Sequence, residues 1–145
     1  MGASIKSKIS RSIMDEFFQQ FFCPDDPEFS LVLEDDGKVA YAYLFKNEKI
    51  IADVWLYNQG DPKDEDYSNL QNLPFLNPSR FINDILLSSL NNAMEEDINV
   101  SWEPQKNLLT VKVEIFKTLT IVLKEGVEVG WSNMVTKDGP FAKKL

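Results

Sequence analysis

The chain has 145 residues, of which 43% are apolar, so it is long enough to bury a substantial core in a single domain covering residues 1–145. Its 23 acidic residues outnumber its 15 basic residues, and the resulting net charge of −8 argues against nucleic acid as a partner. The sequence has no histidine and one cysteine, which excludes Ser-His-Asp or Cys-His catalysis, histidine-ligated zinc and an internal disulfide.

Two segments have the apolar spacing of amphipathic helices. In the first, apolar residues recur at every fourth position before Pro24 and comprise Ile5, Ile9, Ile13, Phe17 and Phe21. The second begins at Asn77-Pro78, a favourable pair for a helix N-cap and first turn, and its apolar residues continue at helical spacing to Met94. We therefore expect one helix in each segment.

Stretches that alternate between apolar and polar residues predict strands in the rest of the chain. They cover residues 29–34, 38–45, 50–57, 98–102, 109–115, 119–123 and 127–131. The connections between them are short, which favours antiparallel pairing of sequential strands. The predicted fold class is therefore α+β: an antiparallel meandering sheet with two helices, in the order helix, three strands, helix, and three or four strands.

The segment from residue 58 to residue 77 is the first candidate for a binding surface, because loops longer than about 12–15 residues are uncommon and often functional. Its acidic residues are Asp61, Asp64, Glu65 and Asp66. Their spacing does not match a calcium-binding loop, so we expect no metal site there. They are either solvated turn residues or a surface that attracts a basic partner.

Asp53 is unusual because it lies in an otherwise apolar predicted strand, where alternation places it on the same face as Trp55 and Tyr57. A carboxyl group among aromatic rings can have a raised pKa or anchor a basic residue of a partner. Alternatively, this face is partly exposed, or Asp53 pairs with a nearby lysine or backbone amide. The neighbouring aromatic side chains either form a contact surface or pack in the core.

No pattern in the sequence identifies a catalytic residue, a metal site or a cofactor site. The glycines are scattered, so the chain has no phosphate-binding glycine loop. A pair of carboxylates that meet in space is the one enzymatic arrangement left open. We therefore predict a protein that is not an enzyme and that uses no cofactor.

The first residues lack the apolar run of a secretion signal, and no later stretch approaches the roughly 20 apolar residues of a membrane-spanning helix. From these two observations we expect a cytoplasmic protein that does not associate with a membrane.

Three stretches resemble small bacterial proteins that act as immunity partners of toxins: DGKVAYAYL (36–44), DVWLYN (53–58) and PFLNP (74–78). This resemblance implies an immunity-like or inhibitor protein whose acidic surface binds a basic partner, either a toxin or a secreted effector. The partner-binding residues would then be Asp53, Trp55, Tyr57, Asp61, Asp64, Glu65 and Asp66.

The predicted order of elements, together with the acidic charge, also resembles type III secretion chaperones. Chaperones of that family are homodimers that bind an extended segment of an effector protein. The sequence thus leaves two binding functions and two oligomeric states, monomer and homodimer, to be distinguished.

Overall fold

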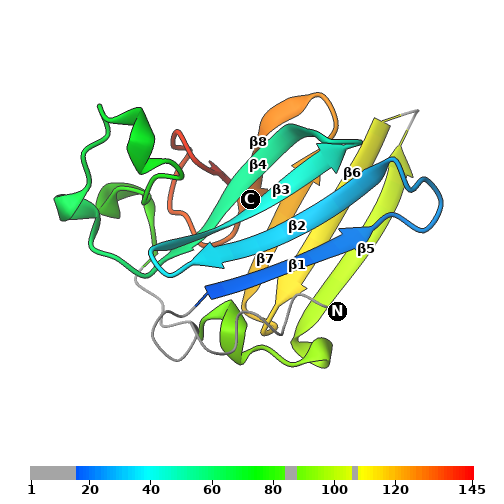
Figure 1. Cartoon of the computed structure of the whole chain (residues 1–145), viewed down its shortest axis with the longest axis horizontal. Helices are drawn as coiled ribbons and strands as arrows, with labels where there is room; N and C mark the ends of the chain where they lie inside the picture. Colours follow the sequence, from blue (N-terminus) through cyan, green and yellow to red (C-terminus); the bar gives the residue numbers. More distant parts are fainter. Residues whose placement is uncertain (1–15, 84–87, 106–107) are drawn as a thin grey trace.

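The computed structural model describes residues 16–83, 88–105 and 108–145, which form a predominantly β structure (Figure 1). The strands in this part of the chain are β1 (Glu16–Phe22), β2 (Phe29–Asp36), β3 (Val39–Lys46), β4 (Lys49–Asn58), β5 (Ile98–Gln105), β6 (Leu108–Ile115), β7 (Leu119–Lys124), β8 (Val127–Ser132) and β9 (Lys143–Lys144). The helical segments are 3-10 turns: η1 (Pro62–Asp64), η2 (Leu70–Asn72), η3 (Ser79–Phe81), η4 (Leu90–Asn92) and η5 (Glu95–Asp97). The prediction of an α+β fold with two helices is therefore wrong, because each described helical segment is a single turn of three residues.

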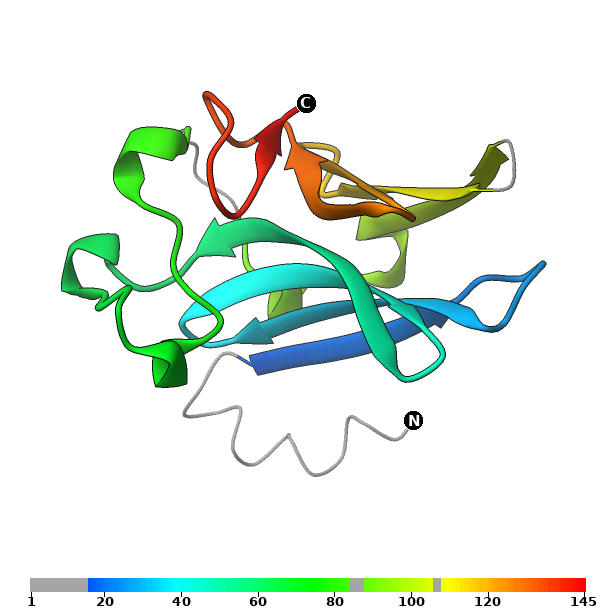
Figure 2. The same ribbon diagram turned by 90° about the horizontal axis from the view of Figure 1, so that it is seen from above.

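Two antiparallel meanders, β1 to β4 and β5 to β8, form one curved sheet with the strand order β1-β2-β3-β4-β8-β7-β6-β5. The last strands of the two meanders, β4 and β8, pair in parallel at Asp53 and Val129. The short strand β9 runs parallel to β8. Figure 2 shows that the curvature brings the two meanders into facing layers, so that the sheet has the shape of half a barrel.

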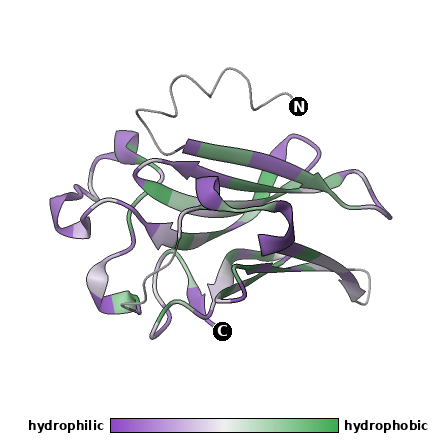
Figure 3. Cartoon of the chain, turned by 90° about the horizontal axis from the view of Figure 1, so that it is seen from below, coloured by the Kyte–Doolittle hydropathy of each residue, from purple (hydrophilic) through white to green (hydrophobic). Residues whose placement is uncertain are grey.

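The hydrophobic core lies between the two layers. In β7 every second residue is fully buried and the residues between them are partly exposed, as expected for a strand with one face on the core. The fully buried side chains of the facing strands include Leu31, Leu33, Leu44, Val54, Val111, Ile115, Leu119, Ile121 and Leu123. Complete burial of one such side chain contributes roughly 1.5–3 kcal/mol, so this layer dominates stability. The segments at the ends of the sheet are mostly hydrophilic (Figure 3).

The first predicted helix is wrong in its described part, because Phe17 and Phe21 lie in strand β1. Ile5, Ile9 and Ile13 lie outside the described residues. A spacing of four residues is close to one helical turn, but it is also a multiple of the strand period of two. Apolar residues four apart therefore share a face in either structure. Aromatic side chains favour strands, and every residue of β1 has a partner in β2, so this segment forms a strand.

The second predicted helix, from Asn77 to Met94, is also wrong in its described residues, which contain the turns η3 and η4. Ile82 is extended and forms an antiparallel bridge with Val135. Leu90 is fully buried in the core. The middle of the predicted helix lies outside the described residues. Contacts with residues distant in the sequence thus override the helical spacing of this segment.

The strands predicted from alternation are confirmed as β2 to β8. The predicted long loop is confirmed as well, because residues 59–77 are irregular apart from η1 and η2. The loop follows directly after β4, which is the strand that carries Asp53.

Candidate functional site

The outer face of the first meander, which points away from the core, carries Asp53. Strand pairing places Asp53 of β4 opposite Tyr43 of β3, and Tyr41 opposite Trp55. The rings of Tyr41 and Tyr43 stack with their centroids 5.9 Å apart. Ala42, which lies between the two tyrosines, is fully buried on the opposite, inner side of the strand.

A β-bulge in β4 separates Tyr57 from Asp53 and Trp55. The register shifts so that Ala40 pairs with Tyr57 while the next residue, Tyr41, pairs with Trp55. The strict alternation expected from the sequence fails at this point, because a bulge inserts one extra residue into the strand. Tyr57 consequently points to the inner side of the sheet.

Tyr57 belongs to a buried hydrogen-bond network around Asp35, which is 1% exposed. The Tyr57 hydroxyl donates to Asp35 Oδ2 at 2.5 Å and accepts from the backbone N–H of Leu90 at 2.7 Å. The side-chain amide of Gln59 donates to both Asp35 oxygens at 2.8 Å, and the backbone N–H of Gly37 donates to Oδ1 at 2.9 Å. This network fixes the fold and leaves Tyr57 inaccessible to a partner.

Trp55 is also buried, with 3% of its surface exposed. Its indole N–H donates to Asn58 Oδ1 at 2.8 Å, and its backbone N–H donates to the carbonyl of Phe141 at 3.0 Å. Tyr41 is 5% exposed and donates its hydroxyl proton to the carbonyl of Phe75 at 2.8 Å. Of the two alternatives for these aromatic residues, packing rather than an exposed contact surface describes Trp55 and Tyr41, because the segments that carry Phe75 and Phe141 cover them on the outer side of the sheet.

Asp53 and Glu34 are half-buried carboxyl groups on the same face. Burial raises the pKa of Asp53, and the neighbouring charge of Glu128 adds to the effect. Burial also raises the pKa of Glu34, with further contributions led by Asp36. Neither carboxyl group forms an ion pair with any described residue of the chain.

Tyr43 lies opposite Asp53 and diagonally across from Glu34, whose direct partner on β3 is Tyr41. Burial raises the pKa of the Tyr43 phenol, and the nearby charges of Glu34 and Asp53 raise it further. Its ring remains partly exposed. Tyr43 is therefore an aromatic group that a partner could contact together with the two acids.

Phe18 lies on the same face, on the edge strand β1, and it is absent from the predicted site residues because the apolar spacing of this segment predicts a helix. Phe18 is 52% exposed and pairs across the strands with Glu34. We name the surface formed by Phe18, Glu34, Tyr43 and Asp53 the acidic-aromatic face. The pattern that could have found Phe18 is the cluster of four Phe residues between positions 17 and 22, had it been interpreted as a strand.

Most of the predicted acidic residues in the loop stabilise the loop itself. The Glu65 side chain is 3% exposed, forms an ion pair of 3.0 Å with Lys38 Nζ and accepts a hydrogen bond from the Leu76 N–H at 3.0 Å. Asp61 caps η1 by accepting from the Lys63 N–H at 3.0 Å.

The other two predicted acidic residues of the loop are Asp66 and Asp64. Asp66 accepts hydrogen bonds from the backbone and the hydroxyl of Ser68 at 3.0 and 2.6 Å, and these bonds lower its pKa. Asp64 is exposed, and its side chain makes no hydrogen bond or ion pair with the described residues. Among the four predicted acidic residues, Asp64 is therefore the one whose carboxylate is not used within the loop.

Three general properties of the chain bear on its function. The described residues contain no group of three or more side chains that could hold a metal ion. In the same part of the chain, no helix has the length and apolar composition needed to cross a membrane. Comparison with protein-family models, curated proteins and solved structures finds no match.

Proposed function

We propose that this chain is a non-enzymatic, cytoplasmic binding protein whose acidic-aromatic face binds a basic partner protein, as an immunity or inhibitor protein does. The observation that supports the proposal most strongly is the state of Asp53. Its carboxylate is half-buried next to Tyr43, its pKa is raised by burial, and no described cation pairs with it. A lysine or arginine of a partner would compensate the desolvation that the free protein bears at this position.

The aromatic side chains support the same kind of partner. Phe18 lies opposite Glu34 across β1 and β2, and Tyr43 is the diagonal neighbour of Glu34 on β3, so a cationic side chain could contact a carboxylate and an aromatic ring together. Cation–π contacts and charge-assisted hydrogen bonds both favour arginine in such positions. Exposed aromatic residues are also the type that contributes most to binding at protein interfaces.

The chaperone alternative depended on a helix, three strands, a helix and further strands in that order. The described residues have strands and single 3-10 turns instead, so that order of elements is not found. We therefore base the proposal on the acidic-aromatic face alone.

The experiment that tests the proposal compares capture by the tagged wild-type protein with capture by two variants, using quantitative mass spectrometry. Asp53→Asn removes the charge at the β4 end of the face, whereas Asp25→Asn removes an exposed turn carboxylate elsewhere. We expect one basic protein to be retained in stoichiometric amount by the wild type and by D25N and to be strongly depleted with D53N.

A third variant distinguishes the face from the loop. Asp64→Asn removes the loop carboxylate that has no described partner. Binding that is lost with D64N but unaffected by D53N would place the partner on the loop and overturn the proposed site.

A further inference from the structure

A cavity of about 620 Å³ lies outside the acidic-aromatic face. Three segments of the chain supply its lining, within positions 62–67, 75–80 and 140–141. Its volume falls within the range of small-molecule sites, which are typically apolar with a few polar groups. Three aromatic rings and three prolines give this cavity the same composition.

One wall of the cavity consists of three aromatic rings. The centroid of Tyr67 is 5.4 Å from that of Phe75 and 6.2 Å from that of Phe141, and the Tyr67 and Phe141 rings are nearly parallel, at 19°. The backbone beneath this wall is bonded to the sheet, because the carbonyl of Phe75 accepts from the Tyr41 hydroxyl and the carbonyl of Phe141 accepts from the Trp55 N–H. The wall is therefore held in place before any ligand binds.

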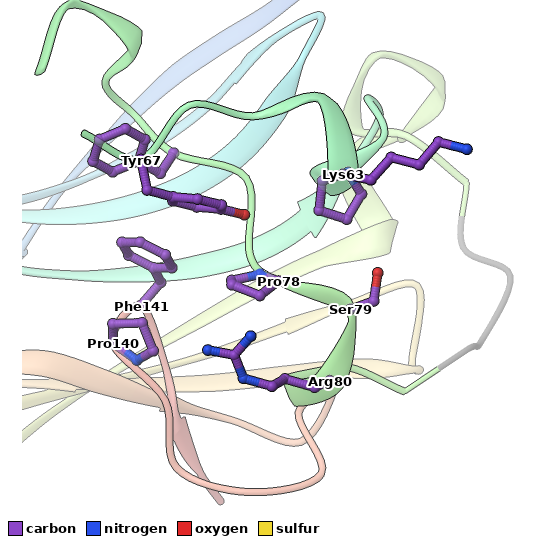
Figure 4. A pocket seen from close by; sticks show the side chains of 9 residues that line it. Lys63, Tyr67, Pro78, Ser79, Arg80, Pro140 and Phe141 are labelled. Atoms are coloured by element: carbon purple, nitrogen blue, oxygen red, sulfur yellow. The ribbon is translucent and has the colours of Figure 1, made fainter. Parts of the chain in front are cut away.

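Arg80 supplies a cation on the opposite side. Its guanidinium lies 4.7 Å from the centre of the Phe81 ring, and Figure 4 shows it extending past Pro78 toward Pro140. Phe81 packs directly against Gly139, where an added Cβ would come within 2.9 Å of the ring. This close approach ties the turn that carries Arg80 to the loop that carries Pro140. The Arg80 side chain makes no ion pair or hydrogen bond with the described residues.

The second basic residue of the lining is less suited to bind a ligand. Lys63 lies 3.5 Å from the Asp61 carboxylate, and its ammonium points away from the other lining side chains in Figure 4. Burial and the charge of Glu65 raise the pKa of Tyr67, and the charge of Arg80 partly offsets this rise. No carboxylate is among the lining residues.

We propose that this cavity binds a small aromatic acid, with its ring against Tyr67 and Phe141 and its carboxylate paired with the guanidinium of Arg80. Arginine is suited to this role because its planar fork of donors matches a carboxylate. The aromatic wall matches a flat ring in an offset stack. The inference is independent of the proposed protein partner, because none of these residues belongs to the acidic-aromatic face.

The test uses two probes of the same shape, 2-naphthoate and 2-naphthamide, each titrated into the full chain labelled with ¹⁵N. Amide chemical shifts report the place of binding and the dissociation constant of each probe. We expect shifts at the segments that contain Tyr67, Arg80 and Phe141, and an affinity for naphthoate about tenfold higher than for naphthamide, the scale of one charge-assisted hydrogen-bond pair.

Two variants then examine the role of Arg80. Arg80→Gln is expected to reduce the affinity ratio of the two probes to about one, because the amide keeps hydrogen-bonding capacity but not charge. Lys137→Gln is the matched control, since Lys137 also lies over the Phe81 ring, at 5.4 Å, but does not line the cavity; its ratio should be unchanged. Equal affinity for both probes in the wild type, shifts elsewhere in the chain, or an unchanged ratio in R80Q would each overturn the proposal. Spectra that agree away from the cavity show that each variant is folded.

Discussion

The hydroxyl of Tyr57 donates a hydrogen bond to the carboxylate of Asp35, which is buried between the two layers of the sheet. The same hydroxyl accepts the backbone N–H of Leu90, so a single oxygen links β2, β4 and η4. An unpaired polar group in such a position is costly, because it has lost its water without gaining a partner. The bulge that turns Tyr57 inward is therefore a structural requirement of the fold.

The first prediction concerns this network. Tyr57→Phe removes one donor to Asp35 and the acceptor of the Leu90 N–H, and should lower the free energy of unfolding by about 1–3 kcal/mol. Urea denaturation measures the change. Tyr43→Phe, on the outer face, is the matched control and should have little effect. Equal losses in the two variants would contradict the structural role of Tyr57.

The second prediction concerns Asp53 and pH. Because burial raises the pKa of Asp53 in the folded chain, the folded state holds a proton that the unfolded state has already released over the interval between the two pKa values. The free energy of unfolding should therefore fall as pH rises through that interval. Asp53→Asn should remove this part of the pH dependence and make the protein more stable at pH 7.

The same variant should bind the basic partner less well. A substitution that improves stability while it weakens binding is typical of a residue retained for function. Thermal denaturation from pH 3 to pH 8 measures the stability effect. If D53N is destabilised at pH 7, the carboxylate has a structural role and our account of it is wrong.

The third prediction concerns the ion pair between Glu65 and Lys38. Glu65→Gln removes the charge from a side chain that is 3% exposed and that accepts from the Leu76 N–H, so the loop should become less firmly attached to the turn that precedes β3. We expect a loss of about 1–2 kcal/mol and faster hydrogen exchange at Leu76. Asp61→Asn, in the exposed pair with Lys63, should change stability by less than about 1 kcal/mol. Unchanged exchange at Leu76 in E65Q would contradict the role assigned to Glu65.

The fourth prediction concerns Asn77, which is fully buried and whose amide nitrogen and oxygen have no hydrogen-bond partner in the described structure. Asn77→Leu replaces these unpaired groups with an apolar side chain of similar size, so the free energy of unfolding should stay the same or increase. Asn58→Leu should instead lower it by about 2 kcal/mol or more, because Asn58 bonds Trp55 and both backbone groups of Asn77. Chemical denaturation of both variants provides the measurement, and a larger loss in N77L than in N58L would contradict this account.

The sequence predicted the strands well because alternation reports directly on a sheet with one face against a core. It failed for the segment containing Phe17 and Phe21, where a spacing of four residues fits both a helix and a strand. It also failed for the segment containing Ile82 and Leu90, where contacts with Val135 and Tyr57, both distant in the sequence, determine the conformation. The cluster of Phe residues is the local signal that favours a strand in the first segment, whereas the conformation of the second depends on contacts distant in the sequence.

The candidate site was predictable only in part. Asp53 was identified as an acid in an apolar strand. The positions of Phe18 and Glu34 on the same face as Asp53 are set by strand register, which sequence alone does not provide. Tyr57 was assigned to the wrong face because a bulge in β4 has no clear sequence signal. Glu65 and Asp64 are adjacent acidic residues that the sequence does not distinguish. Only the fold shows that the Glu65 side chain is buried and paired with Lys38.

The central claim is that the Asp53 carboxylate is held ready for a cation of the partner. The most direct measurement is the pKa of Asp53, followed by carboxyl ¹³C NMR in the free protein and in the complex with the basic protein recovered by the capture experiment. We predict a pKa above the ordinary aspartate value in the free protein and a lower pKa in the complex, because a neighbouring cation stabilises the ionised form. A pKa that is the same in both states would contradict the claim.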